Sequence, residues 1–569
     1  MGKYPVGIYP RPITNPHVRD DACYVIFRWS AAKGIGRLTN RLPKSLADDV
    51  IGTVLECLSP REKDPAWHGA CLALAELGKR GLLLAHRLPA AVSCIMKALV
   101  YDEPKGFCSV GSYIRDAACY VCWAFARAYD HHTLEPLVQQ IAQGLLVVTC
   151  YDKEINCRRA ASAAFQELVG RQGGNPPYGI DILTRADYFS VGNRQSAYLD
   201  ISVYIAQFEA YTRPFIQHLM ARKVEHWDPE IRKLTAKTLP RLVPLDREYF
   251  LTEVLEQLLI KIDSIDLNAR HGATLSLGEV VRALSELKCV IPVETRVRIE
   301  NIVKNFRDKK QLQGLSGEMT RQACCYMIEQ LTAAESHIHT NEWQILLNES
   351  LLHEALSVRT QACEALPVLC RRIYPSGSSY QSLIDLYVSQ LESCSPTSRE
   401  GHAMALGVLP AFMLLPHLDL IIGSLIRCSH VTDATANWTF SRKNAIQALD
   451  SIVGKLQGKR ILLSYVPGLF DCYLMGVEEY TKDSRGKISQ NSTGLLATSQ
   501  YIFTRVLGTK HHFISQYNLL LTPTRPAILF LISRWDLCSR GYMRLESWST
   551  SPMRADTFVL LVPVMFVLS

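Results

Sequence analysis

The chain has 569 residues, of which 48% are hydrophobic and 20% charged, and its formal net charge is +8. So much apolar material excludes low-complexity disorder and predicts a large folded core. The tail from Lys487 onward carries +5 of the charge. The rest of the chain is close to neutral, which argues against a dedicated nucleic-acid surface.

The 18 cysteines are scattered singly and do not form the framework of a disulfide-rich secreted domain. No signal-peptide pattern opens the chain, so we expect a reducing compartment and buried free thiols. No apolar run reaches the roughly 20 residues of a membrane helix. The nearest run, Thr557 to Leu568, is interrupted by Pro563. The sequence therefore predicts no transmembrane segment.

One template recurs along the chain: an arginine, a small residue three places later and an apolar residue seven places later. This spacing puts the small and the apolar residue on one face of a helix. The template starts at Arg28, Arg115, Arg158, Arg194, Arg232, Arg270, Arg321, Arg359, Arg399 and Arg442, and His68 takes the arginine position between the first two. Successive starts lie 36 to 51 residues apart, mostly 38 to 43. That is the period of two-helix HEAT or armadillo units.

The segments between the template helices predict the second helix of each unit. Examples are Leu46 to Leu58, Leu134 to Val148, Phe250 to Ile262 and Leu383 to Leu391. No stretch alternates with a period of two for long enough to indicate a sheet. Since one unit cannot bury its apolar face alone, the units must stack. The predicted fold is all-α, a HEAT/armadillo-type α-solenoid.

The template arginine stands at the start of each helix and can have two roles. It can be structural, pairing with acidic or carbonyl groups of the adjacent unit, or it can bind a ligand. We predict the structural role at each position and keep ligand binding as the alternative.

The segment from Gly173 to Asn193 interrupts the array with a predicted loop. Loops on a rigid scaffold often carry function, and aromatic side chains are effective anchors in protein interfaces. The candidate partner-binding residues are Tyr178, Asp187, Tyr188, Phe189 and Asn193. The alternative is that these aromatic residues cap the core of the neighbouring unit.

The sequence contains no catalytic or cofactor-binding motif. Cys119-x-x-Cys122 is the only cysteine pair with metal or redox spacing near a strong motif, and no second pair accompanies it, so we expect it to face the core. Phosphate-loop, metalloprotease and nucleophile-elbow motifs do not occur in the sequence. We therefore expect no catalytic residue, no metal and no cofactor, and an interaction protein that is not an enzyme.

Several stretches of the chain resemble the tubulin-folding cofactor D family. They read RWSAAKGIGR (Arg28 to Arg37), WHGACLALAELG (Trp67 to Gly78), RDAACYVCWAFARAY (Arg115 to Tyr129) and NCRRAASAAFQE (Asn156 to Glu167), followed by GIDILT (Gly179 to Thr184), ADYF (Ala186 to Phe189) and GNR (Gly192 to Arg194). The resemblance runs from about Arg28 to about Gly486, and family members extend further on both sides.

The resemblance divides the chain into three parts. Residues 1–22 form a leader that does not resemble the family, residues 23–486 are the helical repeats, and residues 487–569 are a divergent tail without the template. We expect the tail to be poorly ordered and to derive from a splice variant or a gene model.

By this resemblance the chain is expected to be a tubulin-folding chaperone scaffold. It would bind β-tubulin, support assembly of the α/β-tubulin heterodimer and indirectly promote GTP hydrolysis by tubulin. Its expected partners are β-tubulin, tubulin-folding cofactors C and E and a small Arf-like GTPase, and its expected location is the cytoplasm, with the centrosome or microtubules as sites of association. The alternative is a generic HEAT-repeat adaptor for another protein, since such arrays share a fold without sharing a partner.

Overall fold

The computed structural model describes residues 16–105, 108–172, 176–334, 341–374 and 380–430, residues 432 and 435, residues 437–456 and residue 465. The chain separates into two compact units, residues 1–342 and residues 343–569. The first helix begins at Pro16, inside the predicted leader, and the predicted tail of residues 487–569 lies outside the described residues. The division of the chain at residues 22 and 486 therefore stays a prediction.

The first unit consists of helices and one short hairpin. Its helices are α1 (Pro16–Thr39), α2 (Lys44–Glu56), α3 (Asp64–Lys79), α4 (Leu88–Ala98), α5 (Ser112–Ala128), α6 (His131–Tyr151), α7 (Ile155–Arg171), α8 (Gly179–Leu183), α9 (Arg194–Ser196), α10 (Ser202–Ala206), α11 (Glu209–His218), α12 (Pro229–Leu242), α13 (Arg247–Tyr249), α14 (Leu255–Ile262), α15 (Leu267–Glu286), α16 (Val293–Glu300), α17 (Ile302–Asp308) and α18 (Gly314–Ala333). The π-helical turns Ala197–Ile201, Leu219–Lys223 and Phe250–Val254 join α9 to α10, extend α11 and join α13 to α14. The strands β1 (Glu103–Lys105) and β2 (Cys108–Val110) pair antiparallel between α4 and α5.

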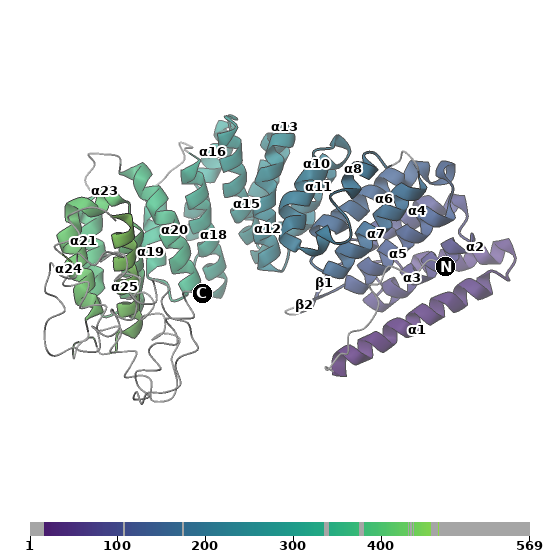
Figure 1. Ribbon diagram of the computed structural model, residues 1–569, viewed down its shortest axis with the longest axis horizontal. Coiled ribbons are helices and arrows are strands. Elements are labelled where there is room, and N and C mark those ends of the chain that lie inside the picture. Colours follow the sequence, from purple (N-terminus) through teal and green to yellow (C-terminus); the bar gives the residue numbers. More distant parts are fainter. Residues whose placement is uncertain are drawn as a thin grey trace, which may run out of the picture. The chain divides into compact units, whose positions relative to one another are not determined.

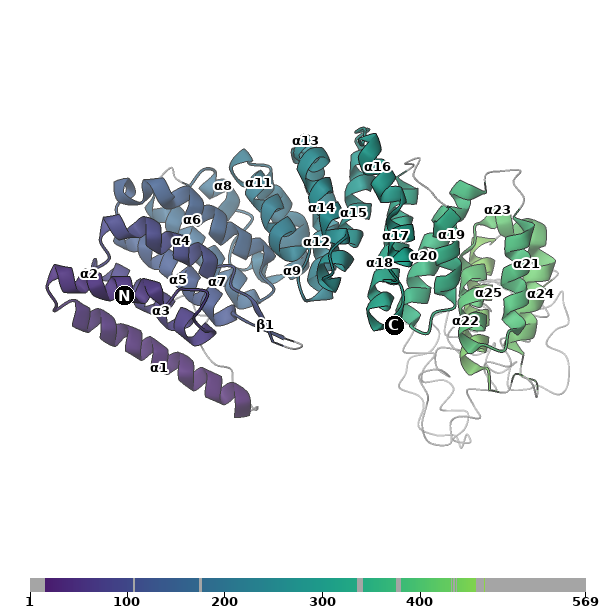
Figure 2. The same cartoon turned by 180° about the vertical axis from the view of Figure 1, so that it is seen from behind.

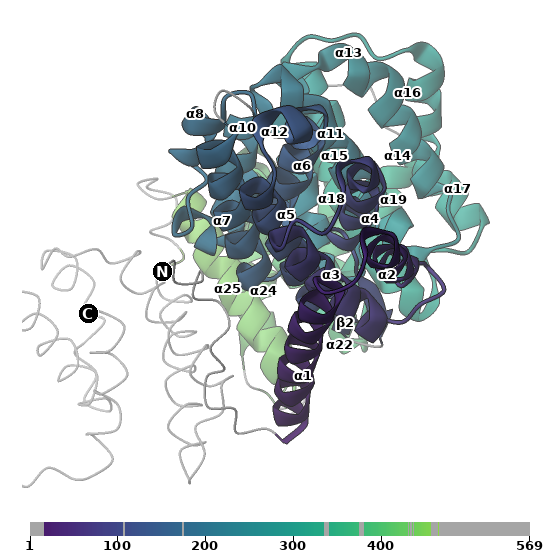
Figure 3. The same ribbon diagram turned by 90° about the vertical axis from the view of Figure 1, so that its right-hand side faces the viewer.

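The helices of the first unit form two layers (Figures 1 and 2). In the template layer, which carries the template residues, α3 packs on α5 and α5 on α7, and α12, α15 and α18 follow one another in the same way. In the second layer α4 packs on α6 and α6 on α11. Figure 3 shows this unit from the end that holds α1, with α2 and α4 to one side of α3 and α5. Paired helices that stack unit upon unit are the arrangement of an α-solenoid, which confirms the predicted fold class.

The second unit has the same organisation. Its helices are α19 (Asn341–Leu351), which begins at the boundary, α20 (Leu356–Ile373), α21 (Gln381–Ser389), α22 (Pro396–Val408), α23 (Ala411–Leu414), α24 (Leu418–Ser429) and α25 (Thr439–Lys455). α20 packs on α22 and α22 on α25, while α21 and α24 cover α22 and α25 from the second layer.

Short polar side chains define where several helices begin. Asp130 accepts a hydrogen bond from the backbone N–H of Thr133 at 2.8 Å and starts α6. Asp228 accepts from the N–H of Glu230 at 3.0 Å and is followed by Pro229, the first residue of α12. Both arrangements satisfy N–H groups that have no partner inside the helix. Proline is favoured at the first helical position for the same reason.

The template residues form the core of the array, as predicted. In ten of the eleven units, all but the one at Arg28, the small residue and the apolar residue are both buried. Ala161 and Phe165 after Arg158, and Ala362 and Leu366 after Arg359, are examples. The arginines at positions 115, 158, 232, 270, 359, 399 and 442 are buried as well, as is His68.

The buried arginines join the turn of their own unit to the next unit. Arg158 donates from Nη1 to the carbonyls of Asp152 and Lys153, both at 3.0 Å, and from Nε to the carbonyl of Val191 at 2.8 Å. Arg232, Arg359 and Arg399 donate in the same way to the carbonyls six and five positions before them. These carbonyls lie at the C-terminal end of the preceding helix, where no backbone N–H of that helix can bind them. The structural role is therefore observed, although most of the carbonyls belong to the arginine's own unit and not to the adjacent one.

The unit at Arg28 departs from the template. Ala31 and Ile35 are exposed, and Ala32 and Gly36 are buried in their place. α1 packs on α3 along one side only, so the helix has turned its small residues toward α3. The other side of α1 exposes Phe27 and Leu38, which have about 70% of their surface accessible (70% and 69%).

The predicted second helices are found close to their expected limits, and Phe250 to Ile262 is helical throughout. The hairpin β1–β2 was not predicted, because strands of three residues are too short to show an alternating pattern. One described helical stretch, Ala411–Ser429, comprises α23 and α24 and is long and apolar enough to cross a membrane by length and composition alone. This stretch was not among the apolar runs considered from the sequence. Its buried residues include Leu418, Ile421 and Leu425, and α24 packs on α25, as a core helix does.

Candidate functional site

The loop that holds the predicted partner-binding residues replaces a full second-layer helix. Residues 173–175 lie outside the described residues, and the rest contains only α8 and one 3-10 turn, Ser190–Gly192. Because no long helix lies between them, α11 packs directly on α6. The side-chain amides of Gln139 and Gln143 donate to the carbonyl of Ala210 at 3.3 and 2.9 Å.

Two of the five predicted residues hold the loop in shape. Oδ1 of Asp187 accepts hydrogen bonds from the backbone N–H groups of Phe189 (2.6 Å) and Ser190 (3.0 Å). Oδ1 of Asn193 accepts from the N–H groups of Gln195 and Ser196 and starts α9. These contacts give Asp187 and Asn193 positioning roles inside the loop.

The three aromatic residues of the loop point in different directions. Phe189 is 81% exposed and makes an edge contact with Tyr188. Tyr178 adopts a left-handed backbone conformation (φ 57°) and stacks on Phe208 with ring centroids 4.4 Å apart. Tyr188 is half-buried beneath the guanidinium of Arg159, 4.9 Å from the ring centroid. Binding of a partner by these residues stays a prediction.

Tyr188 borders a groove on the template layer, which we call the aromatic groove. Its rings are Trp29 from α1, Tyr113, Tyr120 and Trp123 from α5, and Tyr188 from the loop. The space between these rings is about 250 Å³ and is open to solvent. The alanines at positions 117, 160, 163 and 164 line it. Because these side chains are small, a space remains between the neighbouring helices, and the larger aromatic rings enclose it.

Cations of the same chain already lie on several of these rings. Trp29 and Tyr120 are in contact at 5.2 Å, and Tyr120 stacks on Trp123 at 5.7 Å. The ammonium of Lys33 lies 5.1 Å from the Trp29 ring, and the guanidinium of Arg127 lies 4.9 Å from the Trp123 ring. Electron-rich ring faces attract such groups.

The carboxylate of Asp116 lines the aromatic groove and has no partner among the described residues. Asp116 is half-buried and makes no hydrogen bond or ion pair with any other described residue. Burial, together with the nearby charge of Asp152, raises the pKa of Asp116 to about 6. His68, also in the lining, accepts from Nη1 of Arg28 at 3.2 Å, and burial lowers the pKa of its imidazole to about 4.

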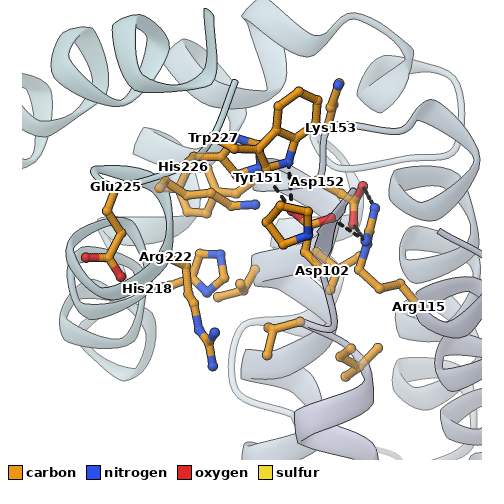
Figure 4. A pocket seen from close by; sticks show the side chains of 16 residues that line it. Asp102, Arg115, Tyr151, Asp152, Lys153, His218, Arg222, Glu225, His226 and Trp227 are labelled. Atoms are coloured by element: carbon orange, nitrogen blue, oxygen red, sulfur yellow. Dashed lines mark hydrogen bonds and ion pairs between the residues drawn. The ribbon is translucent and has the colours of Figure 1, made fainter. Parts of the chain in front are cut away.

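A second pocket lies among the inter-helix turns of three repeat units, and several of the side chains that line it bind one another (Figure 4). Asp102, just before β1, accepts hydrogen bonds from Nε1 of Trp227 (3.2 Å) and Nε2 of His226 (3.3 Å). Arg115 bridges Asp102 and Asp152, at 3.5 and 2.6 Å. These contacts connect the hairpin, the start of α7 and the start of α12, so the pocket is a structural junction.

Lys223 also lines this junction, and it forms no ion pair with the described part of the chain. Burial lowers the pKa of its ammonium to about 8, although the charges of Asp152 and Asp102 oppose that effect.

Within the described residues no three His, Cys, Asp or Glu side chains are grouped so that they could hold a metal ion. Cys119 and Cys122 are both buried, as predicted, and burial raises the pKa of each thiol, that of Cys122 to about 12.

Trp29, Asp116, Tyr120 and Trp123 were not predicted as site residues, although their spacing in the sequence carries a signal. Trp29 and Asp116 come one place after a template arginine, Tyr120 five places after and Trp123 eight places after. Places one, five and eight share a helix face that differs from the buried face at places three and seven. Reading that second face along the template layer would have identified the aromatic groove.

The fold and the groove define a helical-repeat scaffold. Residues 19–180, which include nearly the whole groove, match the family described as "Tubulin-specific chaperone D-like, ARM repeats". Over these residues the chain is similar to the tubulin-specific chaperone D-like family.

Two curated relatives belong to the same group of proteins as this match. The chain is 39% identical over 324 residues to tubulin-specific chaperone D of Dictyostelium discoideum, which covers 56% of this chain and 22% of that protein. It is 32% identical over 272 residues to tubulin-folding cofactor D of Schizosaccharomyces pombe, covering 45% and 24%. The chain thus spans less than a quarter of each relative's length. A crystal structure of importin-β is also similar, at 14% identity and a TM-score of 0.47, covering 98% of this chain and 64% of that one.

Proposed function

We propose that this chain acts as a non-catalytic tubulin-folding scaffold that binds β-tubulin and supports assembly of the α/β-tubulin heterodimer. The observation that carries the proposal is the 39% identity over 324 residues to a tubulin-specific chaperone D. At that identity the helices and most of the surface between them are expected to correspond. The chain covers only 22% of that relative, so the proposal concerns the part of the tubulin contact that this region provides.

The aromatic groove and the loop beside it are the proposed contact surface. The groove lies on the template layer, and the loop beside it provides the exposed ring of Phe189 and the half-buried ring of Tyr188. Aromatic side chains contribute much of the binding energy in protein interfaces, because they bury a large area at a small cost in side-chain entropy. A rigid helical array holds them at fixed spacing, which reduces the cost of ordering on binding.

The further partners are proposed on the same resemblance. Tubulin-folding cofactors C and E and a small Arf-like GTPase would join the complex, which would promote GTP hydrolysis by tubulin indirectly. A cytoplasmic protein that associates with the centrosome or with microtubules would meet these partners.

A binding experiment with β-tubulin tests the proposal. The full chain would be immobilised and exposed to newly translated β-tubulin, beside the double variant Tyr188→Ala, Phe189→Ala. We expect the wild-type chain to retain β-tubulin and the double variant to retain at least about tenfold less, since interface aromatics often contribute 2 kcal/mol or more, roughly thirtyfold. Phe440→Ala, which removes a 55% exposed ring from α25, is the matched control and should bind as the wild type does. A wild-type chain that does not retain β-tubulin would refute the proposed function.

A further inference from the structure

We propose that the aromatic groove receives an arginine side chain of the protein partner, with Asp116 as its counter-ion and the rings of Trp29, Tyr113 and Tyr120 as its walls. The inference deepens the proposed function, since it names the chemistry of the contact at that site. The proposed binding of an arginine side chain in the groove does not depend on which protein supplies that side chain.

The first reason is that Asp116 has no partner within the part of the chain that the structure describes. A carboxylate removed from water costs free energy unless a cation or hydrogen-bond donors compensate it. The buried acid Glu76, on the neighbouring helix α3, is compensated in this way, because it contacts Lys79 and Arg80 at 3.5 and 3.6 Å. The half-buried Asp116 lines the open space of the groove without such a contact among the described residues. A charged group that lowers the stability of the fold and lines a groove indicates a role in binding and not in folding.

The second reason is the shape of the lining. The alanines at positions 117, 160, 163 and 164 leave a slot, and aromatic rings flank it. A guanidinium is flat, stacks on ring faces and can place two N–H groups on one carboxylate. The chain itself shows that its rings accept such a group, because Arg127 lies on Trp123 and Arg159 on Tyr188.

The third reason is the balance of charge inside the groove. Its lining contains two carboxylates, Asp116 and Glu154, and a single permanent cation, Arg159. Arg159 is placed over the Tyr188 ring, and His68 is neutral at physiological pH because its pKa is about 4. Lys33 lies on Trp29 at the α1 end. Lys79 likewise lies on Tyr120, 5.9 Å from the ring centroid. These cations are held at the rings, and none of the described cations pairs with Asp116. The carboxylate of Asp116 therefore suits a basic side chain and disfavours an acidic one.

A peptide array separates this inference from the proposed function. The probe is a set of short peptides of one neutral host sequence whose central residue is arginine, lysine, citrulline or glutamate. Citrulline keeps the shape of arginine and removes its charge. We expect the full wild-type chain to bind the arginine peptide at least about tenfold more tightly than the citrulline peptide, since a hydrogen bond to a charged group is worth about 1.5–3 kcal/mol. Equal binding of the two peptides would overturn the inference.

Variants of the chain test whether Asp116 causes the preference for the arginine peptide. Asp116→Asn, which keeps the side-chain shape, should lose most of the arginine preference, and Asp116→Ser serves if the first variant folds poorly. Asp49→Asn removes the same charge from an exposed position on α2, in the second layer, and should keep the preference. If Asp116→Asn prefers arginine as strongly as the wild type does, the inference is wrong.

The outcome with β-tubulin stays distinguishable from the outcome with peptides. If the wild-type chain prefers arginine peptides but does not retain β-tubulin, the proposed function fails and the arginine site stands. If β-tubulin is retained equally by the wild type and Asp116→Asn, and the peptides show no preference for arginine, the arginine site fails and the proposed function stands.

Discussion

The indole Nε1 of Trp227 donates a hydrogen bond to Oδ2 of Asp102, 125 positions earlier in the chain, at 3.2 Å. His226 reinforces the contact: its Nδ1 accepts from the backbone N–H of Asp228 at 3.0 Å, so its Nε2 carries the proton that faces Asp102. The contact exists because the loop of residues 176–193 contains no long helix, which lets α11 pack on α6 and brings the turn before α12 to the hairpin. Asp102 thereby links units that are not neighbours in sequence.

Replacing Asp102 with asparagine should loosen this junction. The variant loses the negative charge that Arg115, His226 and Trp227 share, and hydrogen bonds to a charged group are worth about 1.5–3 kcal/mol. We expect the local free energy of opening to fall by about 2 kcal/mol. Amide hydrogen exchange in residues 108–112 and 224–231 would report it. Asp200→Asn is the control, because its carboxylate, paired with Arg241, is largely exposed. Equal protection in both variants would contradict the role assigned to Asp102.

The same junction predicts a dependence on pH. Burial would raise the pKa of the Asp102 carboxyl, but hydrogen bonds from His226 and Ser109 and the charge of Arg115 hold it well below its usual range. A lowered pKa in the folded state means that the stabilisation is present above the unfolded pKa of about 3.9 and is lost as the pH falls below it. The difference in protection between wild type and Asp102→Asn should therefore be constant from pH 8 to 5 and shrink toward pH 3. A difference that grows toward pH 3 would contradict this assignment.

The template arginines should be essential for stability. Arg232 is fully buried and donates to the carbonyls of His226 and Trp227, to Asn268 and to His271. Burial lowers the pKa of its guanidinium to about 10, so the group is charged at neutral pH. Arg232→Met leaves buried carbonyls without a donor, at about 1–3 kcal/mol each, and we expect a loss of about 3 kcal/mol in the free energy of unfolding measured with denaturant. Lys237→Ala, an exposed residue of the same helix, should change it by less than about 0.5 kcal/mol.

The sequence could predict the helices and their buried faces because both depend on local spacing. Ala161 and Phe165 are buried because a helix brings places three and seven after Arg158 to one face. The contact between Asp102 and Trp227 could not be predicted in this way, since it depends on the absence of a long helix in a loop lying between them in the chain. The exposure of Ile35 also escaped prediction: the template residues of α1 are buried only if helices pack on both sides of it, and within the described residues one side is covered by α3.

Glycine 272 is required by a close approach of two backbones. A Cβ atom at Gly272 in α15 would lie 1.8 Å from the carbonyl oxygen of Val224, so alanine forces the units apart. We expect Gly272→Ala to lower the free energy of unfolding by about 1–3 kcal/mol, as overpacked cores do. Gly69→Ala in α3 is the matched control, because nothing lies within 4 Å of its Cβ position. That control should stabilise its helix by about 1 kcal/mol. Equal effects of the two substitutions on the unfolding midpoint would contradict the close approach.

The stability of an Asp116 variant provides a test that needs no partner. The folded pKa of about 6 lies above the unfolded value, which is about 3.9. Between these values the folded state holds more protons than the unfolded state, so the contribution of Asp116 becomes less favourable as the pH rises from about 4 to 6 and then stays constant. Asp116→Asn lacks this titration and should be more stable than the wild type by about 3 kcal/mol at pH 7.5, with a difference that disappears near pH 4. Unfolding midpoints of the wild type, Asp116→Asn and Asp49→Asn between pH 4 and 8 would measure it. A residue that supports the fold would give the opposite result, a less stable variant at pH 7.5. The expected gain in stability, combined with a loss of arginine binding, is the signature of a charge that serves recognition at the expense of folding.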